Sequence, residues 1–377
     1  MLVTGIILGV IVLVLLIVVH ELGHAVVARR NGVVVEEFGI GFPPKAWGKK
    51  LKNGILFTLN WLPLGGFVKL KGEHDAAKGE GTYGAATFWQ KTKILYAGVV
   101  MNLLVAALLF TILAWVGLPK VVEYQFSVPG DTRVTTGSVT LTAIVPGSAA
   151  ETAGFAAGDK IVAINNADVT DSRSFISSTR AHAEQTIEIV LERDGERMTK
   201  NVALGAVSAK GVFGAQVAQR EAIHATWSAP IVGIVTTGQL SWETLKGLGT
   251  IIGKLASGVT GKFSSNEAVR QQANQAIDEV AGSVAGPVGI LGVIFPSVQH
   301  QGIVQIVLLT AVISLTLGVM NALPIPALDG GRWWTMAIFR LLGKKLTRER
   351  EENVQATGFF ILMGLIVLIT IADIGKF

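Results

Sequence analysis

Four long apolar runs divide the chain. Residues 2–19, 94–118 and 303–328 contain no charged side chain, and residues 354–372 contain Gln355 as their one strongly polar side chain. A helix needs about 20 mostly apolar residues to cross the hydrocarbon core of a bilayer. We therefore predict an α-helical polytopic membrane protein with four transmembrane helices.

Two other uncharged stretches have a different character. Residues 225–242 are rich in Ser, Thr and Trp, and residues 280–299 are broken by glycine and proline. Such segments fit the membrane interface better than the bilayer core. We expect both at the membrane edge. If both crossed the membrane, the two crossings would cancel, and the segments before and after them would stay on the same sides of the membrane.

Strand patterns occupy two regions between the apolar runs. In "GILFTLNWLPLGGFVKLKGE" (54–73), β-prone residues flank Pro63 and Gly65-Gly66, as in a hairpin. Residues 138–203 alternate strand-like runs with Gly, Pro and Asp turns, and their last part predicts a hairpin around Asp194-Gly195.

The composition supports a membrane protein. Half of the 377 residues are apolar and 16% are charged, against about a quarter in ordinary soluble proteins. The net charge of +5 is modest, so we interpret it as membrane-flanking bias and expect no nucleic-acid partner. The chain has no cysteine, which excludes thiolate ligands, disulfides and a cysteine nucleophile.

The basic residues predict the orientation in the membrane. Lysine and arginine are concentrated in residues 29–93 and 332–350, and such segments usually remain cytoplasmic. Residues 119–302 are long and nearly balanced in charge, so we expect them on the outer side. Both termini then also face outward.

One motif carries chemistry. His20-Glu21-Leu22-Gly23-His24 fits H-E-x-x-H and closes the first apolar run. On a helix, positions i and i+4 share a face, so both imidazoles can bind one metal ion while Glu21 takes a proton from water. The alternative is a polar helix end at the interface, but ionisable residues within a span are costly and usually functional.

A catalytic zinc site usually has a third protein ligand. Asp329 is a candidate because it ends "NALPIPALD", where Pro324 and Pro326 break helical hydrogen bonding and Gly330-Gly331 loosens the chain. Non-helical backbone at membrane depth must line a wet cavity or be buried in protein. Asp329 capping the next helix is an equally good reading of these residues alone. We expect His74, His182, His224, His300 and Asp373 to be solvated surface residues.

The two motifs together resemble the site-2 protease family of intramembrane zinc metalloproteases, in particular the bacterial regulator-of-sigma-E protease type. The resemblance covers nearly the whole chain. It implies that Zn²⁺ is held by His20, His24 and Asp329, with Glu21 as general base. It also implies that Asn321 and the hairpin residues Gly65, Gly66 and Phe67 bind substrate in an extended form. An ordinary cytoplasmic hairpin without that role is the alternative.

The outer segment resembles a bacterial PDZ domain in "PGSAAETAGFAAGDKIVAIN". PDZ domains bind an extended peptide by strand addition. "KGVFGAQV" (210–217) fits either a carboxylate-cradling loop or a closing strand without a ligand role. We expect residues 1–118 to hold two transmembrane helices and the loop 29–93, residues 119–218 a single PDZ domain, residues 219–301 membrane-surface helices, and residues 302–377 the last two transmembrane helices.

The expected function is cleavage within the transmembrane segment of a single-span membrane protein, such as an anti-sigma factor or a signal-peptide remnant, after trimming on its outer side. The expected partners are that substrate, a peptide ligand of the PDZ domain and the lipid bilayer of the bacterial cytoplasmic (inner) membrane. The alternatives are a non-catalytic scaffold that presents a PDZ domain and a membrane zinc peptidase of another family.

Overall fold

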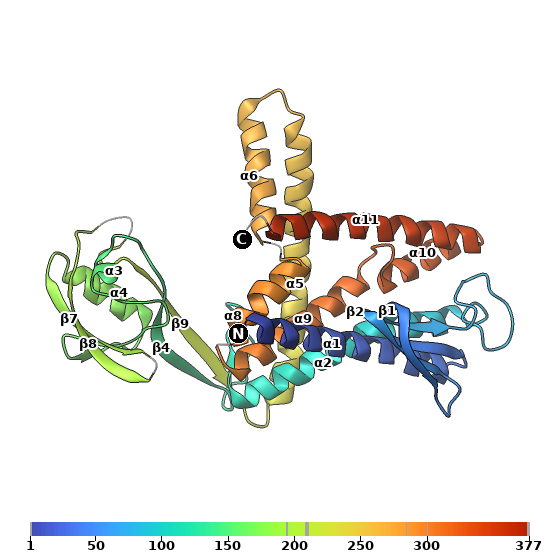
Figure 1. Ribbon diagram of the computed structural model, residues 1–377, viewed down its shortest axis with the longest axis horizontal. Coiled ribbons are helices and arrows are strands. Elements are labelled where there is room, and N and C mark those ends of the chain that lie inside the picture. Colours follow the sequence, from blue (N-terminus) through green and yellow to red (C-terminus); the bar gives the residue numbers. More distant parts are fainter. Residues whose placement is uncertain (1, 194, 208–210, 284, 300, 375–377) are drawn as a thin grey trace. The chain divides into compact units, whose positions relative to one another are not determined.

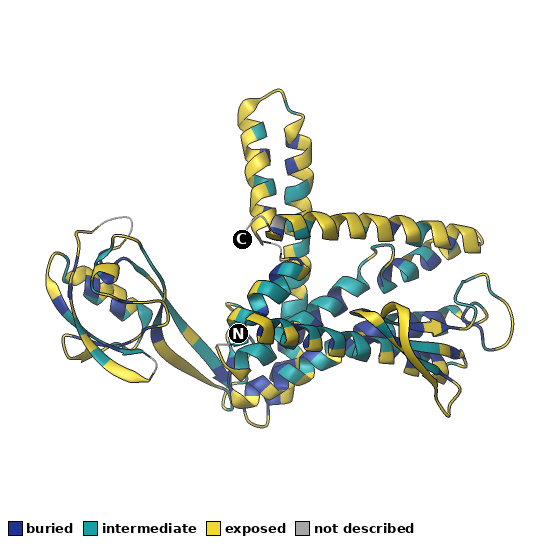
Figure 2. Ribbon diagram, viewed as in Figure 1, coloured by how far each residue is buried: buried dark blue, intermediate teal, exposed yellow. Residues whose placement is uncertain are grey.

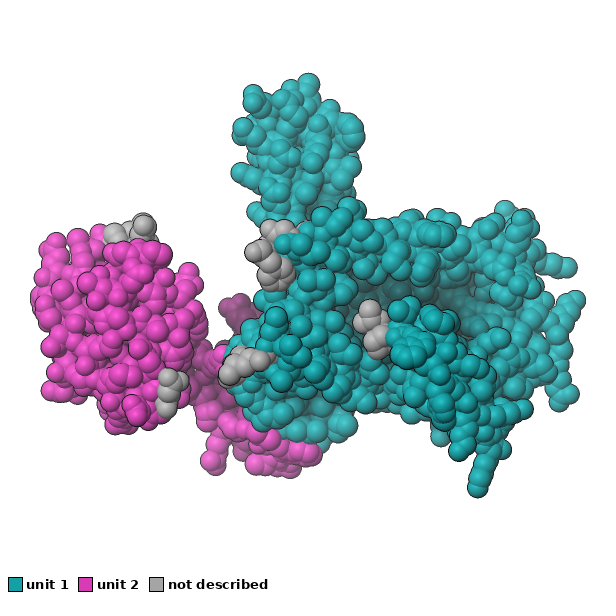
Figure 3. All heavy atoms as spheres, viewed as in Figure 1, with its two compact units in different colours: residues 1–113, 230–377 teal, residues 114–229 magenta. Residues whose placement is uncertain are grey.

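The computed structural model describes residues 2–374 except residues 194, 208–210, 284 and 300, and it consists of two compact units (Figures 1 and 3). Unit 1 comprises the chain up to Leu113 and from Pro230 onward, and unit 2 comprises Ala114–Ala229. Unit 1 is mainly helical, whereas unit 2 is built around a β-sheet (Figure 1).

Four helices of unit 1 coincide with the predicted spans. They are α1 (Leu2–Arg30), α2 (Phe88–Val116), α9 (Ile303–Ala322) and α11 (Arg348–Ile374), and each is long and apolar enough to cross a membrane. Much of their surface is exposed, most of all along α11 (Figure 2), as expected of helices that face lipid. The third predicted span extended to residue 328, but α9 ends at Ala322, because Pro324 cannot continue the helical hydrogen bonding.

The two ambiguous stretches are helical for most of their length. Residues 225–242 fall mostly in α5 (Ala229–Lys262), which lies beside α6 (Glu267–Ser283) and is joined to it by a Lys254–Glu279 ion pair of 2.6 Å. Residues 280–299 include the end of α6, α7 (Pro287–Gly289), the π-helical turn η1 (Ile290–Ile294) and α8 (Phe295–Gln299). Together with α6, the last three form a helix pair, bent by 44°, that is also long and apolar enough to be one further membrane span.

The segment from α7 to α8 packs on α1. A side-chain carbon at Gly5 would lie 2.6 Å from Pro296, and one at Gly9 would lie 2.7 Å from the Phe295 ring. Phe295 is fully buried there with Val12 and Leu16. Both glycines therefore allow the segment to approach the N-terminal half of α1 closely.

The prediction of a solvated Asp373 was wrong. Asp373 is 2% exposed, and its Oδ2 accepts hydrogen bonds from the backbone N–H groups of Gly286 and Gly289, each at 2.9 Å. The carboxylate lies at the N-terminus of α7, where the helix dipole favours a negative charge. It ties the end of α11 to the segment that packs on α1.

The hairpin region is a small antiparallel sheet with a more complex register than predicted. Its strands are β1 (Val35–Lys50) and β2 (Leu56–Leu70). Phe38, Gly39 and Ile40 pair with Val68, Phe67 and Gly66 in one arm of β2 and with Phe57, Thr58 and Leu59 in the other. The chain does reverse near Pro63–Gly66, but the two arms flank residues 37–40 instead of pairing with each other.

Unit 2 is a sheet with the strand order β3-β9-β4-β5-β7-β8, and β6 pairs with β5. The strands are β3 (Leu118–Pro119), β4 (Arg133–Ile144), β5 (Lys160–Ile164), β6 (Ala167–Asp168), β7 (Thr186–Arg193), β8 (Glu196–Ala203) and β9 (Ala215–His224). The helices α3 (Ala149–Thr152) and α4 (Ser172–Ala181) complete it, with Phe155, Phe175 and Phe213 in the core. The predicted hairpin forms between β7 and β8, and its turn residue Asp194 lies outside the described residues.

Candidate metal centre

Two imidazoles project from one face of α1. His20 is 8% exposed, and its Nε2 atom lies 3.2 Å from Nε2 of His24, one helical turn later. The spacing of four residues brings the rings together, as expected for an H-E-x-x-H helix.

A third candidate ligand atom comes from far along the chain. Asp329 is the first residue of α10 (Asp329–Leu341), and its Oδ2 atom lies 3.0 Å from Nε2 of His20 and 3.2 Å from Nε2 of His24. Leu328 occupies the N-cap position of α10, and the Asp329 carboxylate one residue later points to the histidines.

The loop between α9 and α10 places Asp329. A side-chain carbon at Gly330 would lie 2.4 Å from the carbonyl oxygens of Ala322 and Leu323, and one at Gly331 would lie 2.0 Å from that of Ile325. The two glycines therefore let the first turn of α10 press against the proline-broken backbone. We expected them to loosen the chain, but they make the loop tighter.

The three ligand atoms suit a zinc ion. They lie within 4.8 Å of one another, and two imidazole nitrogens with one carboxylate oxygen are typical catalytic zinc ligands. Ligands about 2.0–2.1 Å from a tetrahedral ion are roughly 3.4 Å apart, close to the observed 3.0–3.2 Å. Zinc sites of this kind leave a fourth position for water.

The orientation of His24 also suits metal binding. Its Nδ1 atom lies 2.8 Å from the carbonyl oxygen of Ile94 in α2. A carbonyl oxygen only accepts, so Nδ1 carries the proton and donates it, which leaves the lone pair of Nε2 for a metal. Gly98, one turn further along α2, lies directly against both rings, because a side-chain carbon there would be 2.4 Å from Nε2 of His24.

The strand β2 runs past Glu21. A side-chain carbon at Gly66 would lie 3.5 Å from Cγ of Glu21 and 3.2 Å from Ile17 of α1. Gly65 and Phe67 face β1 instead, since a side-chain carbon at Gly65 would meet the Phe42 ring and one at Gly39 would meet the Phe67 ring. Of the three predicted hairpin residues, Gly66 is therefore the one that borders the H-E-x-x-H helix.

Asn321 lies near the end of α9, and its Nδ2 group donates to the carbonyl of Leu317 at 2.9 Å. The other histidines lie apart from the ligand cluster: Nε2 of His74 is 3.5 Å from Glu352, His182 bonds to Ser178, and His224 packs on Gly117. His300 lies outside the described residues.

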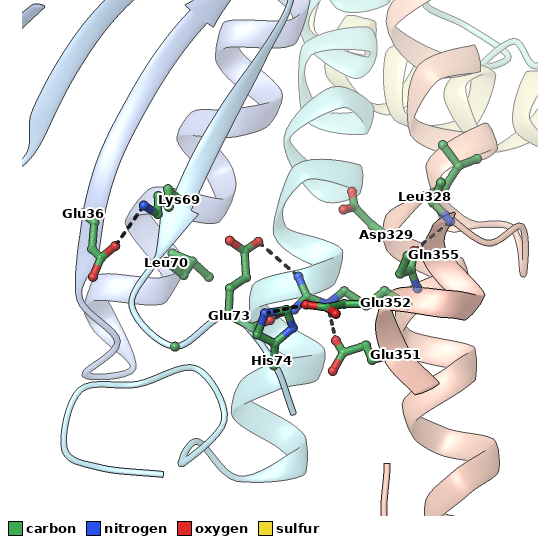
Figure 4. Close-up of a pocket in the computed structure, with 13 residues that line it drawn as sticks. Glu36, Lys69, Leu70, Glu73, His74, Leu328, Asp329, Glu351, Glu352 and Gln355 are labelled. Atoms are coloured by element: carbon green, nitrogen blue, oxygen red, sulfur yellow. Dashed lines mark hydrogen bonds and ion pairs between the residues drawn. The ribbon is translucent and has the colours of Figure 1, made fainter. Parts of the chain in front are cut away.

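A polar cavity of about 530 Å³ opens beside Asp329 (Figure 4). Its wall includes Glu73, His74, Arg332 and Glu351. Arg332 bonds to Glu73 at 3.2 Å and to Glu351 at 3.1 Å. Burial alone would lower the pKa of Arg332, but the negative charges around it raise that pKa above its ordinary value. The guanidinium therefore stays charged and links α10 to α11 and to the loop after β2.

Comparison with known proteins gives a consistent result. A family model described as peptidase family M50 matches residues 8–365. Zinc metalloprotease RasP of Bacillus licheniformis is 29% identical, with 96% of each chain covered, and the regulator of sigma-W protease RasP of Bacillus subtilis is 27% identical with the same coverage. A putative zinc metalloprotease of Clostridium acetobutylicum is 31% identical over 95% of this chain and 94% of that protein.

Among solved structures, the PDZ domain of an SdrC-like protein from Listeria monocytogenes covers 22% of this chain and 92% of its own chain. Its identity is 22% and its TM-score is 0.21.

Proposed function

The chain belongs to peptidase family M50, the site-2 protease family of zinc metalloproteases, and from that premise we propose that it cleaves single-span membrane proteins within their transmembrane segments. The observation that carries this proposal is that Asp329 of α10 meets His20 and His24, which lie on a helix apolar enough to span a membrane. Membership of a zinc metalloprotease family argues against the two alternatives, a non-catalytic scaffold and a zinc peptidase of another family.

The proposed roles follow from the geometry. His20, His24 and Asp329 would hold a Zn²⁺ ion, which would supply Lewis-acid chemistry to the scissile carbonyl and to a water molecule. Glu21 takes one proton from that water as its oxygen forms a bond to the carbonyl carbon. The same carboxyl returns the proton to the amide nitrogen as the C–N bond breaks. The products are a new carboxyl terminus and a new amine.

The substrate must present an extended backbone, because the amides of an intact helix are occupied by their own hydrogen bonds. Residues 66–70 pair with β1 on one side only within the described sheet, and Gly66 borders Glu21. We assign the other edge of this arm to an unwound substrate strand added by backbone hydrogen bonds. Gly65 and Phe67 would shape the arm, and Asn321 would contact the substrate after releasing Leu317.

Unit 2 is proposed to act as a PDZ domain for an extended peptide. A cavity of about 430 Å³ lies between α4 and the start of β9, with Phe175, Ile176 and Val212 in its wall. The loop before β9 includes Gly211 and Gly214, both at positive φ, whereas Lys210 of "KGVFGAQV" lies outside the described residues. Trimming of a substrate on its outer side would create a new peptide terminus, and unit 2 would recognise the trimmed substrate by binding that terminus in this cavity.

The chain is an integral membrane protein. We propose that it resides in the bacterial inner membrane with unit 2 and both termini outside, and that the metal centre is reached by water from the cytoplasm. The support is the concentration of Lys and Arg in residues 29–93 and 332–350, and the polar cavity beside Asp329.

A trapping experiment tests the proposed function. Glu21→Gln removes the proton acceptor but keeps the shape of the side chain and all three ligands. Expressed in a bacterial host, this variant should retain zinc and accumulate bound single-span proteins, identified by cross-linking and mass spectrometry. The matched control is the double variant with His20→Ala and His24→Ala, which should bind less zinc than Glu21→Gln. The proposal fails if Glu21→Gln cleaves as fast as the parent chain, or if it captures only soluble proteins.

A further inference from the structure

Three positions of α2 lie along the two histidines. Ile94, Gly98 and Asn102 are spaced by four residues, so they share one face of the helix. The Ile94 carbonyl accepts from His24, and Gly98 leaves room for both rings. Asn102 is 1% exposed, and its amide group lies 3.2 Å from Nδ1 of His20. None of the proposed catalytic roles uses this asparagine.

The Asn102 contact decides which nitrogen of His20 can bind a metal. In the geometry as it stands, Nδ2 faces Nδ1 of His20, and Oδ1 has no hydrogen-bond partner among the described residues. An amide nitrogen only donates, so Nδ1 would have to accept and the ring proton would lie on Nε2. That tautomer blocks the nitrogen that points at Asp329 and His24.

A half turn of the amide removes this conflict. The two amide atoms are nearly equal in size, so Oδ1 can take the place of Nδ2 without a change in packing. In the orientation as it stands, Oδ1 is the buried amide atom without a partner in the described part of the chain. Metal binding decides between the two orientations, because a metal on Nε2 requires a proton on Nδ1 and an acceptor next to it.

We propose that Asn102 is a positioning residue of the metal centre: its side-chain oxygen accepts the Nδ1 proton of His20 and holds Nε2 free for zinc. Asn102 thus acts on His20 as the Ile94 carbonyl acts on His24. The α2 helix supplies one acceptor for each histidine, with Gly98 between them. This inference rests on the proposed assignment of His20 as a ligand.

The backbone of Asn102 provides a matched control. Its carbonyl accepts a hydrogen bond of 2.8 Å from the fully buried hydroxyl of Ser314 in α9. Ser314→Ala therefore removes a buried hydrogen bond at the same residue without touching its side chain. A purely structural role for this region predicts similar effects from Ser314→Ala and Asn102→Leu.

The test measures zinc affinity by chelator competition and the visible spectrum of the Co²⁺-substituted protein, on the full chain in detergent. Asn102→Leu keeps the branched shape of the side chain but removes the acceptor, and should weaken zinc binding about ten- to hundred-fold. It should also shift the Co²⁺ bands. Ser314→Ala should keep the zinc affinity within about two-fold of the parent chain and leave the Co²⁺ bands in place, because both histidines keep their acceptors.

Asn102→Asp tests the direction of the hydrogen bond and stays informative if Asn102→Leu does not fold. A carboxylate has no N–H group, so it can only accept from His20. Zinc binding as tight as in the parent chain, or tighter, supports the proposal. Loss of zinc by Asn102→Asp, or unchanged zinc affinity and Co²⁺ spectrum in Asn102→Leu, overturns it. Loss of zinc in His20→Ala is the separate check on the ligand assignment itself.

Discussion

At the scale of single residues, the metal centre depends on groups that are not ligands. Gly98 is the simplest case, because a side-chain carbon there would lie 2.4 Å from Nε2 of His24 and 2.6 Å from Nε2 of His20. These distances are shorter than any normal contact between such atoms. The two ring nitrogens that face the metal could not both keep their positions.

Gly98→Ala should therefore lose zinc while the helix itself becomes more favourable. Alanine stabilises a helix interior by about 1 kcal/mol relative to glycine, whereas displacement of the rings should weaken zinc binding by about ten-fold or more. Chelator competition measures the change. Gly364→Ala in α11, where a side-chain carbon meets nothing within 4 Å, should leave zinc affinity unchanged. Equal zinc affinity of the two variants would contradict the account.

In unit 2, one buried carboxylate connects stability to pH. Asp159 is 1% exposed and accepts from Arg193 twice, at 2.6 and 2.7 Å. Burial favours the neutral acid, but the hydrogen bonds from Arg193 and from the Ala156 N–H outweigh it and lower the pKa of Asp159. Its stabilising contribution is complete above the usual pKa of about 3.9, and it is lost as the pH falls through the lowered native value.

Asp159→Asn should thus destabilise unit 2 at pH 7 by about 2–3 kcal/mol, because it removes one partner of a buried charged pair. The difference from the parent chain should shrink below pH 4. The measurement is the urea concentration at which a protease begins to cleave unit 2, determined at each pH with a protease that is active at that pH. Asp168→Asn, at an exposed position in β6, is the control. A difference that stays constant from pH 7 to pH 3 would argue against this role of the carboxylate.

At the scale of secondary-structure elements, the position of the β2 arm beside α1 matters most. The arm 66–70 has one partner in the described sheet, and a side-chain carbon at Gly66 would lie 3.5 Å from Cγ of Glu21. An extended substrate added to this edge would bring its carbonyl groups toward Glu21, the proposed general base. The strand and the helix together would form the active site.

Gly66→Val should slow cleavage without loss of zinc. Its side chain would press on Ile17 and Glu21 and fill the space meant for a substrate strand. A shift of about 1 Å at such a site can cost roughly a hundred-fold in rate, so we expect kcat/KM to fall by at least ten-fold. The assay follows cleavage of a single-span substrate alongside zinc content. The control is Lys49→Val at an exposed position of β1, which should have little effect on cleavage. Equal activity of the two variants would show that residues 66–70 are not part of the active site.

The sequence revealed elements whose pattern is local. The apolar runs predict α1, α2, α9 and α11, and the histidine spacing predicts a shared helix face. It did not reveal the burial of Asp373, the two-sided pairing of residues 37–40 or the contacts of Gly98 and Asn102 with the histidines, because each depends on a partner from another element. A polar Asn102 inside an uncharged span was a usable signal, since polar groups at membrane depth need partners. The choice between Asp329 as ligand and as helix cap also needed the three-dimensional arrangement.

At the scale of the whole molecule, the orientation in the membrane determines how substrate reaches the metal. The absence of cysteine makes this testable with single introduced thiols. Lys52→Cys lies in the turn between β1 and β2, and Asn201→Cys lies at an exposed position of β8. The host should have an outer membrane that a maleimide reagent crosses and an inner membrane that it does not cross. In intact cells the maleimide should then label the thiol at position 201, and it should label the thiol at position 52 only after lysis. The reverse pattern would invert the proposed topology.

The most direct test of intramembrane proteolysis is the position of the cleaved bond. The purified chain, reconstituted in liposomes with a single-span substrate already trimmed on its outer side, should cut a bond inside the apolar segment, as mapped by mass spectrometry of both products. Cleavage should stop when zinc is chelated, return when zinc is restored, and be absent in Glu21→Gln. A cut confined to the soluble flanks of the substrate, or one that persists in Glu21→Gln, would contradict the account.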